Sequence, residues 1–105
     1  MWKIQLFELN FDHKEKHAIE EVLKSKWLAM GERVSEFEKN FEDLLGDEVR
    51  CNAVSSCTAA LHLGLMASDV SKGDEVIIPS LTFISAPNVV TQLGATPILS
   101  DCKSI

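Results

Sequence analysis

The sequence lacks a surplus of basic residues and carries a net charge of −6 over 105 residues. This balance argues against nucleic acid or an anionic membrane as the main partner, because both attract basic surfaces. No apolar run approaches the length of a membrane span, and residues 1–5 lack the apolar core of a signal peptide. If the protein binds a phosphate group, the backbone dipoles next to that phosphate must hold it, because the surface as a whole is not basic.

Cysteine is scarce, and its three copies, Cys51, Cys57 and Cys102, match no metal-binding spacing. They fit a reducing cytoplasm, where we expect the protein. The patterns G-x-G-x-x-G and G-x-x-x-x-G-K-[ST] are also missing, which counts against a common nucleotide-binding domain. An apolar content of 46% nevertheless predicts a folded chain, with room for one small domain.

Two amphipathic helices are predicted within residues 1–48. The first is expected from His13 to Lys26, with Asp12 as its N-cap and Glu15 completing a capping box. The second is expected from Val34 to Leu45. Its apolar residues at helical spacing define a face that we expect to be buried: Phe37, Phe41, Leu44 and Leu45. The segment from Trp2 to Phe11 is predicted to form an edge strand or an extended arm.

An α/β pattern is predicted for residues 49–105. Apolar runs at Val49–Val54, Glu75–Pro79 and Thr96–Ser100 indicate strands, and helices are expected from Thr58 to Ser68 and from Ile84 to Leu93. The order β-α-β-α-β implies parallel strands joined by right-handed crossovers, so the fold class is α/β. The first of these helices is expected to bury one side: Ala60, Leu61, Leu63, Leu65 and Met66.

The predicted first strand turns into its helix through small and hydroxylated residues, Ser55 to Thr58. The first turn of a helix carries unpaired N–H groups and the positive end of the macrodipole, so this bend could hold a phosphate. Ser and Thr before a helix are also ordinary N-caps, each worth roughly 1 kcal/mol. Taken alone, the stretch favours capping over phosphate binding.

A second group of side chains, from Ser80 to Phe83, follows the second predicted strand. Ligands of parallel sheets bind beyond the carboxyl ends of the strands, so Phe83 is predicted to lie near Thr58. A phosphorylated, planar aromatic ligand would satisfy both positions. Stacking on the Phe83 ring would add about 0.5–1.5 kcal/mol beyond the burial of its surface.

Several segments together resemble a known family. The stretch from Gly73 to Phe83, with Asn88 and Leu93 to Pro97 after it, is similar to the DegT/DnrJ/EryC1/StrS family of pyridoxal-phosphate-dependent sugar aminotransferases. Residues Ser55 to Leu63 resemble the family's Ser-Gly-Thr-Ala-Ala-Leu-His-Leu segment, except that Cys57 stands where many members have glycine. The resemblance implies the N-terminal part of the large domain of the aspartate-aminotransferase fold.

The resemblance also covers the first half of the chain, and it implies that the chain has two parts. Trp27-Leu28-x-x-Gly31, with Phe37-Glu38, is similar to the family's N-terminal helical region. Residues 1–48 would form an arm and two helices, and residues 49–105 would begin the cofactor-binding large domain. Both would belong to a single, incomplete domain.

Pyridoxal 5′-phosphate is the cofactor that the resemblance implies. It assigns these cofactor-binding positions: Cys57, Thr58, Ala59, Phe83, Ser56 and Ser80. The first three would hold the phosphate, Phe83 would stack on the pyridine ring, and the two serines would be neighbours. It also implies that Trp27, Met30 and Gly31 lie near the active-site entrance, close to a nucleotide-sugar.

The resemblance implies an enzyme that moves an amino group from an amino acid, expected to be glutamate, to a keto nucleotide-sugar. No lysine of this chain lies in the context of the family's Schiff-base lysine, so no catalytic residue is assigned. We therefore expect an N-terminal fragment that is inactive alone, and a site shared across a homodimer in the whole enzyme. Two alternatives remain: a sugar dehydratase of the same family, or a non-catalytic homologue that only self-associates or binds a partner.

Overall fold

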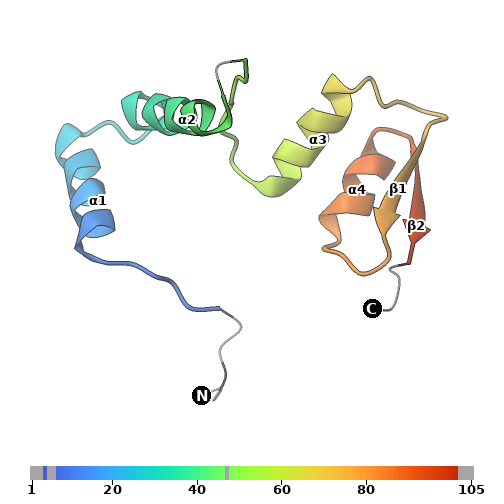
Figure 1. The fold of residues 1–105 in the computed structure, drawn as a ribbon, viewed down its shortest axis with the longest axis horizontal. Coiled ribbons are helices and arrows are strands. Elements are labelled where there is room, and N and C mark those ends of the chain that lie inside the picture. Colours follow the sequence, from blue (N-terminus) through green and yellow to red (C-terminus); the bar gives the residue numbers. More distant parts are fainter. Residues whose placement is uncertain (1–3, 5–6, 47, 102–105) are drawn as a thin grey trace. The chain divides into compact units, whose positions relative to one another are not determined.

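The computed structural model of the protein describes residue 4, residues 7–46 and residues 48–101. This part of the chain contains four helices and two strands. They fall into two compact units, Met1–Cys51 with α1 and α2, and Asn52–Ile105 with α3, β1, α4 and β2 (Figure 1).

Helix α1 spans His13–Ser25 and begins at a capping box. The Asp12 carboxylate accepts a hydrogen bond from the Lys14 amide at 2.6 Å, and the Asp12 amide donates to Glu15 Oε2 at 2.8 Å. These bonds satisfy amides that the first turn of a helix otherwise leaves without acceptors. The helix and the capping box predicted from the sequence are both confirmed.

Helix α2 spans Glu32–Leu45 and ends at Gly46, whose φ of 115° suits glycine and whose amide donates to Glu42 O at 2.9 Å. The expectation of a buried face on this helix was wrong: its four apolar residues, Phe37, Phe41, Leu44 and Leu45, are all exposed. The reason is that, within the described residues, no other helix or strand packs against α2. Phe37 and Phe41 instead contact each other, with ring centroids 6.0 Å apart.

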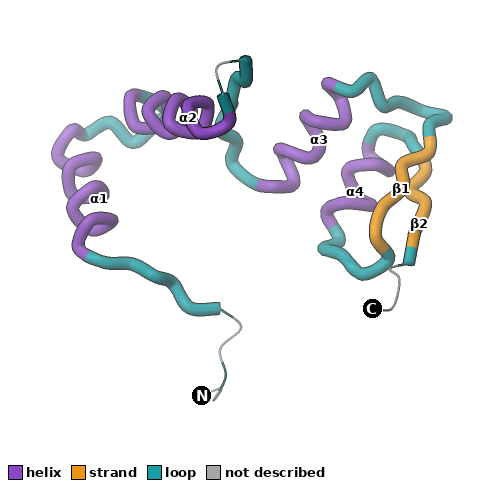
Figure 2. The backbone as a smooth tube through the Cα atoms, in the orientation of Figure 1, coloured by secondary structure: helices purple, strands orange, loops and turns teal. Residues whose placement is uncertain are grey.

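The second unit is built on two parallel strands, β1 at Glu75–Pro79 and β2 at Thr96–Ser100 (Figure 2). Both have the predicted bounds. The ladder continues past each end, because Thr96 N donates to Asp74 O at 2.9 Å and Ser80 N donates to Ser100 O at 2.8 Å. Parallel strands need a crossover connection, and here it is supplied by α4, Ser85–Gln92.

The core of this unit lies where α4 packs against the two strands. Its buried residues are Ile78, Ser85, Val89, Val90 and Ala95, and Val89 and Val90 are each only 1% exposed. Helix α3, Cys57–Ala67, contacts α4, but none of its own residues is buried. The predicted burial of one side of this helix was therefore wrong, because in the described residues α4 alone packs against it.

The first predicted strand, Val49–Val54, is also absent from the described residues. Its backbone is tied locally instead: Val49 N donates to Gly46 O at 3.1 Å, and Cys51 N donates to Glu42 Oε1 at 2.9 Å. A strand exists only when a neighbour accepts its ladder bonds, and no segment of the described chain pairs with this one. The observed unit is thus α-β-α-β.

Two further expectations fall partly outside the described residues. Residues 1–3 and 5–6 of the expected edge strand or arm are not described, and residues 7–11 belong to no helix or strand. Cys102 also lies outside the described residues. Among residues 4, 7–46 and 48–101, no helix combines the length and apolar character that crossing a membrane requires.

The capping box predicts a pH dependence of α1. The hydrogen bond from the Asp12 amide lowers the pKa of Glu15 below its ordinary value of 4.5. Because the folded pKa is depressed, its contribution is present above pH 4.5 and is lost as the pH falls through the folded pKa. In an Asp12→Asn background, whose N-cap side chain does not titrate, the amide proton of residue 12, followed by NMR, should show this transition, and Glu15→Gln should abolish it. A transition that persists in Glu15→Gln would contradict this assignment.

Candidate functional site

The pairing of β1 with β2 brings helix starts and strand ends to one edge of the second unit. Both strands run in the same direction, and α3 and α4 run roughly opposite to them (Figure 1). The starts of the two helices therefore lie at the edge where the strands end. Crevices at this edge are where α/β sheets bind ligands.

Ser56 is the N-cap of α3 and has extended backbone geometry. Its hydroxyl accepts a hydrogen bond from the Ala59 amide at 3.2 Å, and its carbonyl accepts one from the Ala60 amide at 3.0 Å. The capping interpretation therefore holds for Ser56. It leaves the Ala59 amide already engaged, so a ligand oxygen would compete with the Ser56 hydroxyl for that donor.

Two donors remain at the first turn of α3. Among the described residues, the amides of Cys57 and Thr58 have no acceptor, and both side chains are exposed. The Thr58 hydroxyl adds a third donor without a partner in this part of the chain. The helix continues for eleven residues, so its macrodipole places positive potential at these groups. This arrangement suits an anion held by two or three hydrogen bonds.

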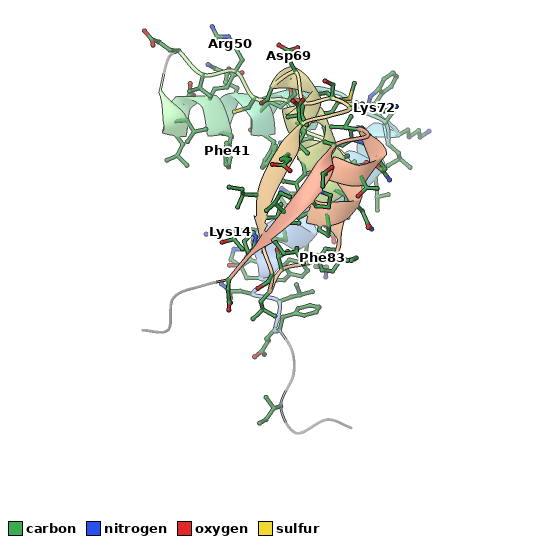
Figure 3. All side chains as sticks on the ribbon, turned by 90° about the vertical axis from the view of Figure 1, so that its right-hand side faces the viewer. Lys14, Phe41, Arg50, Asp69, Lys72 and Phe83 are labelled. Atoms are coloured by element: carbon green, nitrogen blue, oxygen red, sulfur yellow. The ribbon has the colours of Figure 1, made fainter. Side chains whose placement is uncertain are left out.

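The second group of predicted residues leaves the end of β1. Phe83 is 76% exposed, so its ring is available to a ligand. Its carbonyl accepts a hydrogen bond from Ala86 N at 3.2 Å, close to the start of α4. The Ser80 amide donates a hydrogen bond to the carbonyl oxygen of Ser100 on β2, and the Ser80 side chain is exposed. Figure 3 shows Phe83 at one end of this unit and Lys72 with Asp69 at the other, so Lys72 is remote from Phe83.

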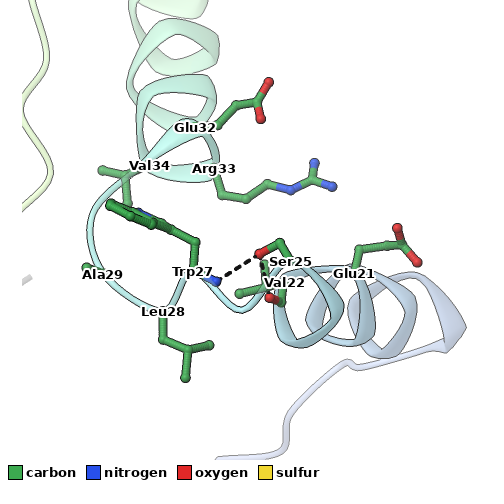
Figure 4. Close-up of a pocket in the computed structure, with 10 residues that line it drawn as sticks. Glu21, Val22, Ser25, Trp27, Leu28, Ala29, Glu32, Arg33 and Val34 are labelled. Carbon is green, nitrogen blue, oxygen red and sulfur yellow. Dashed lines mark hydrogen bonds between the residues drawn. The ribbon is translucent and has the colours of Figure 1, made fainter.

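The predicted substrate residues lie in the first unit, around a pocket of about 610 Å³ between the end of α1 and the start of α2 (Figure 4). Trp27 and Gly31 line it, whereas Met30 does not. The Trp27 amide donates to Ser25 Oγ at 3.2 Å, and the Ser25 hydroxyl donates to Val22 O at 2.7 Å. The backbone of Trp27 is thereby tied to the last turn of α1.

The Trp27 ring is fixed by its neighbours across the turn. Its Nε1 donates to the carbonyl oxygen of Met30 at 3.0 Å. Its ring lies against Gly31, where a Cβ would come within 2.6 Å of Nε1 and 2.8 Å of Cδ1. Met30 therefore holds the Trp27 ring through its backbone carbonyl, and Gly31 leaves room for that ring because it has no side chain.

Charged residues complete the pocket, and the sequence interpretation missed them. Glu21, Glu32 and Arg33 all line it. The sequence positions of Glu32 and Arg33 could have indicated them, because both residues directly follow Gly31 at the start of α2. Arg33 Nη1 lies 3.0 Å from Glu36 Oε2, and Glu21 Oε1 lies 2.8 Å from Lys24 Nζ.

The sequence profile of the DegT/DnrJ/EryC1/StrS aminotransferase family matches residues 10–104. The chain therefore belongs to this family, as the motifs predicted. The solved structures below support the predicted fold class as well, the N-terminal part of the large domain of pyridoxal-phosphate-dependent transferases.

Three similar structures illustrate the match. The sugar aminotransferase candidate Spr1654 from Streptococcus pneumoniae is 30% identical, with a TM-score of 0.83 over 97% of this chain. The GDP-4-keto-6-deoxy-D-mannose-3-dehydratase of E. coli is 30% identical, with a TM-score of 0.84 over 93%. The aminotransferase TlmJ from Streptoalloteichus hindustanus is 35% identical, with a TM-score of 0.79 over 91%.

These comparisons also bear on length and cofactor. The chain spans 26% of the length of each of the three proteins. Spr1654 is known in pyridoxal-phosphate and pyridoxamine-phosphate forms, and the dehydratase structure contains hydrated pyridoxal phosphate. The cofactor implied by the sequence motifs is thus the one that these neighbours contain.

Gly31→Ala should displace the Trp27 ring. A Cβ at position 31 cannot share space with Nε1, so the ring must move and lose its bond to Met30, worth roughly 0.5–1.5 kcal/mol. In a Trp2→Phe background, the single indole N–H resonance should shift and exchange with solvent several-fold faster. Gly64→Ala is the matched control, because a Cβ there meets nothing within 4 Å. Equal spectra for the two variants would contradict the contact.

Proposed function

We propose that this chain forms the part of a sugar aminotransferase that binds the phosphate and one ring face of pyridoxal 5′-phosphate. The whole enzyme would transfer an amino group from an amino acid, expected to be glutamate, to a keto nucleotide-sugar. The observation that carries the proposal is the edge of the second unit, where α3 begins with free amides and Phe83 exposes its ring.

The start of α3 fits a phosphate ester. Hydrogen bonds to charged groups contribute about 1.5–3 kcal/mol each, so the Cys57 and Thr58 amides and the Thr58 hydroxyl together could hold a phosphate without a basic side chain. This agrees with the net charge of −6, which rules out a general attraction for anions. The Ala59 amide would join only if the Ser56 hydroxyl released it.

Phe83 fits the other end of the cofactor. An exposed aromatic ring offers a flat apolar surface to a pyridine ring. Together, the two features orient the cofactor, because the phosphate fixes one end and the ring contact fixes its plane. Ser80 and Ser56 would be polar neighbours of the bound group.

When bound, pyridoxal phosphate supplies an electron sink for chemistry at the amino carbon. The residues of this chain would bind and orient it, and they would limit the access of water to one of its faces. None of its lysines is assigned to the covalent attachment of the cofactor. We propose that residues 49–105 begin the cofactor-binding large domain and that residues 1–48 form its N-terminal arm and helices.

The pocket beside Trp27 supports a place for the nucleotide-sugar. Trp27 and Gly31 line this pocket, and Met30 holds the ring of Trp27. We expect the whole enzyme to be a homodimer, and the many exposed apolar residues of the described chain, such as Leu44 at 77%, are compatible with association.

A sugar dehydratase is the second candidate. The E. coli dehydratase matches this chain with a TM-score of 0.84, against 0.79 for the aminotransferase TlmJ. The two kinds of enzyme therefore share the architecture of this region. Cofactor binding at α3 would serve either reaction, and the proposed residues are the same in both.

Thr58→Val should weaken the binding of pyridoxamine 5′-phosphate by about tenfold, because it removes one donor to a charged group while keeping the shape of the side chain. Pyridoxamine phosphate is the suitable probe, since its amine does not react with surface lysines. Calorimetry or ³¹P NMR gives the dissociation constant. Thr58→Ser, which keeps the hydroxyl, is the matched control and should bind like the parent chain.

Phe83→Leu should also weaken the binding, by the stacking contribution of about 0.5–1.5 kcal/mol. Pyridoxine, which lacks the phosphate, should bind detectably more weakly than pyridoxamine phosphate to every variant.

Equal affinity of Thr58→Val and Thr58→Ser for pyridoxamine phosphate would remove the Thr58 hydroxyl from the site. No binding of pyridoxamine phosphate to the parent chain would contradict the proposed function itself.

A further inference from the structure

The pocket between α1 and α2 has a composition that distinguishes between the parts of a nucleotide-sugar. We infer that it binds the uncharged, hydroxylated sugar ring and not the diphosphate. This inference rests on the proposed function, because it takes a nucleotide-sugar as the substrate. The volume of about 610 Å³ lies within the usual range for small-molecule sites, roughly 300–1,000 Å³.

The Trp27 ring supplies a flat apolar wall. It is held by its bond to Met30 O and by its contact with Gly31, yet it remains 63% exposed. A sugar ring has an apolar face of C–H groups and an edge of hydroxyls. The negative face of an indole attracts polarised C–H groups, and a ring that is already fixed loses little entropy when it binds.

Two carboxylates supply acceptors for the hydroxyl edge. Glu32 has no ion-pair partner among the described residues, and Glu21 keeps one oxygen beyond its pair with Lys24. Ionised carboxylates only accept hydrogen bonds, so they match hydroxyl donors and offer nothing to a phosphate oxygen. Such charge-assisted bonds are roughly twice as strong as neutral ones.

The charges at the pocket disfavour phosphate. Arg33 is the one cation among the described residues that line it, and Glu36 Oε2 already lies 3.0 Å from that guanidinium. The positive end of the α2 dipole also faces this region, but Glu32 in its first turn provides an anion there. Counting Lys24 and Glu36 with the lining residues, carboxylates outnumber cations by one. A diphosphate placed here would meet charge of its own sign, which weakens its binding.

The test uses the 105-residue chain with Trp2→Phe, so that Trp27 gives the single indole N–H resonance in a ¹H–¹⁵N spectrum. Three probes are titrated separately: methyl α-D-mannopyranoside, GDP and GDP-mannose. We expect the glycoside and GDP-mannose to shift the Trp27 resonance in a saturable way, and GDP to leave it unchanged. Glu32→Ala should weaken the response to the glycoside by about tenfold, because one charge-assisted bond is lost.

Glu20→Ala is the matched control, because Glu20 is an exposed carboxylate of α1 that does not line the pocket. It should leave the titration unchanged. A shift caused by GDP but not by the glycoside would overturn the inference and would put the phosphates in this pocket, while the proposed nucleotide-sugar substrate would stand. No shift with any of the three probes would overturn the inference, whereas the proposed function is tested separately by the binding of pyridoxamine phosphate.

Discussion

The parallel pairing of β1 with β2 is the constraint on which the candidate cofactor site depends. Because the strands run in the same direction, the chain must cross back through α4 between them. This crossing brings the start of α4 and the residues after β1 to one edge. Helix α3 contacts α4, so its own first turn is brought to the same edge. In the proposed site, the amides of Cys57 and Thr58 would hold the phosphate of a ligand whose ring lies on Phe83.

The first unit follows a different principle, since its bonds join residues close in sequence. The Trp27 ring is held by residues three and four positions further along the chain. The Asp12 and Glu15 capping box likewise spans three residues. Such local contacts can build a pocket wall without a large core, but they cannot bury the apolar face of α2. The exposed Phe37 and Leu44 mark the surface where further packing would have to come from elsewhere.

Features with local causes could be predicted from the sequence. The capping residues predicted the start of α1, and apolar runs predicted the bounds of β1 and β2. Features that need a partner could not be predicted in the same way. Val49–Val54 has the composition of a strand but no neighbour in the described chain.

The same distinction between local features and features that need a partner applies to the candidate site. The bend from Ser56 into α3 and the position of Phe83 after β1 followed from sequence order, and the family motifs named the cofactor. The sequence did not indicate that Ser56 already occupies the Ala59 amide, or that Met30 acts through its carbonyl. Both depend on three-dimensional geometry that the residue types do not specify.

We propose that one ligand spans the start of α3 and the ring of Phe83. Intermolecular nuclear Overhauser effects with bound pyridoxamine 5′-phosphate test it most directly. We expect contacts from the C6 proton, which is the single proton on the pyridine ring, and from the ring methyl group to Phe83. In the same complex we expect contacts from the methylene group beside the phosphate to the Thr58 methyl group. Contacts to only one of these residues, or to neither, would contradict it.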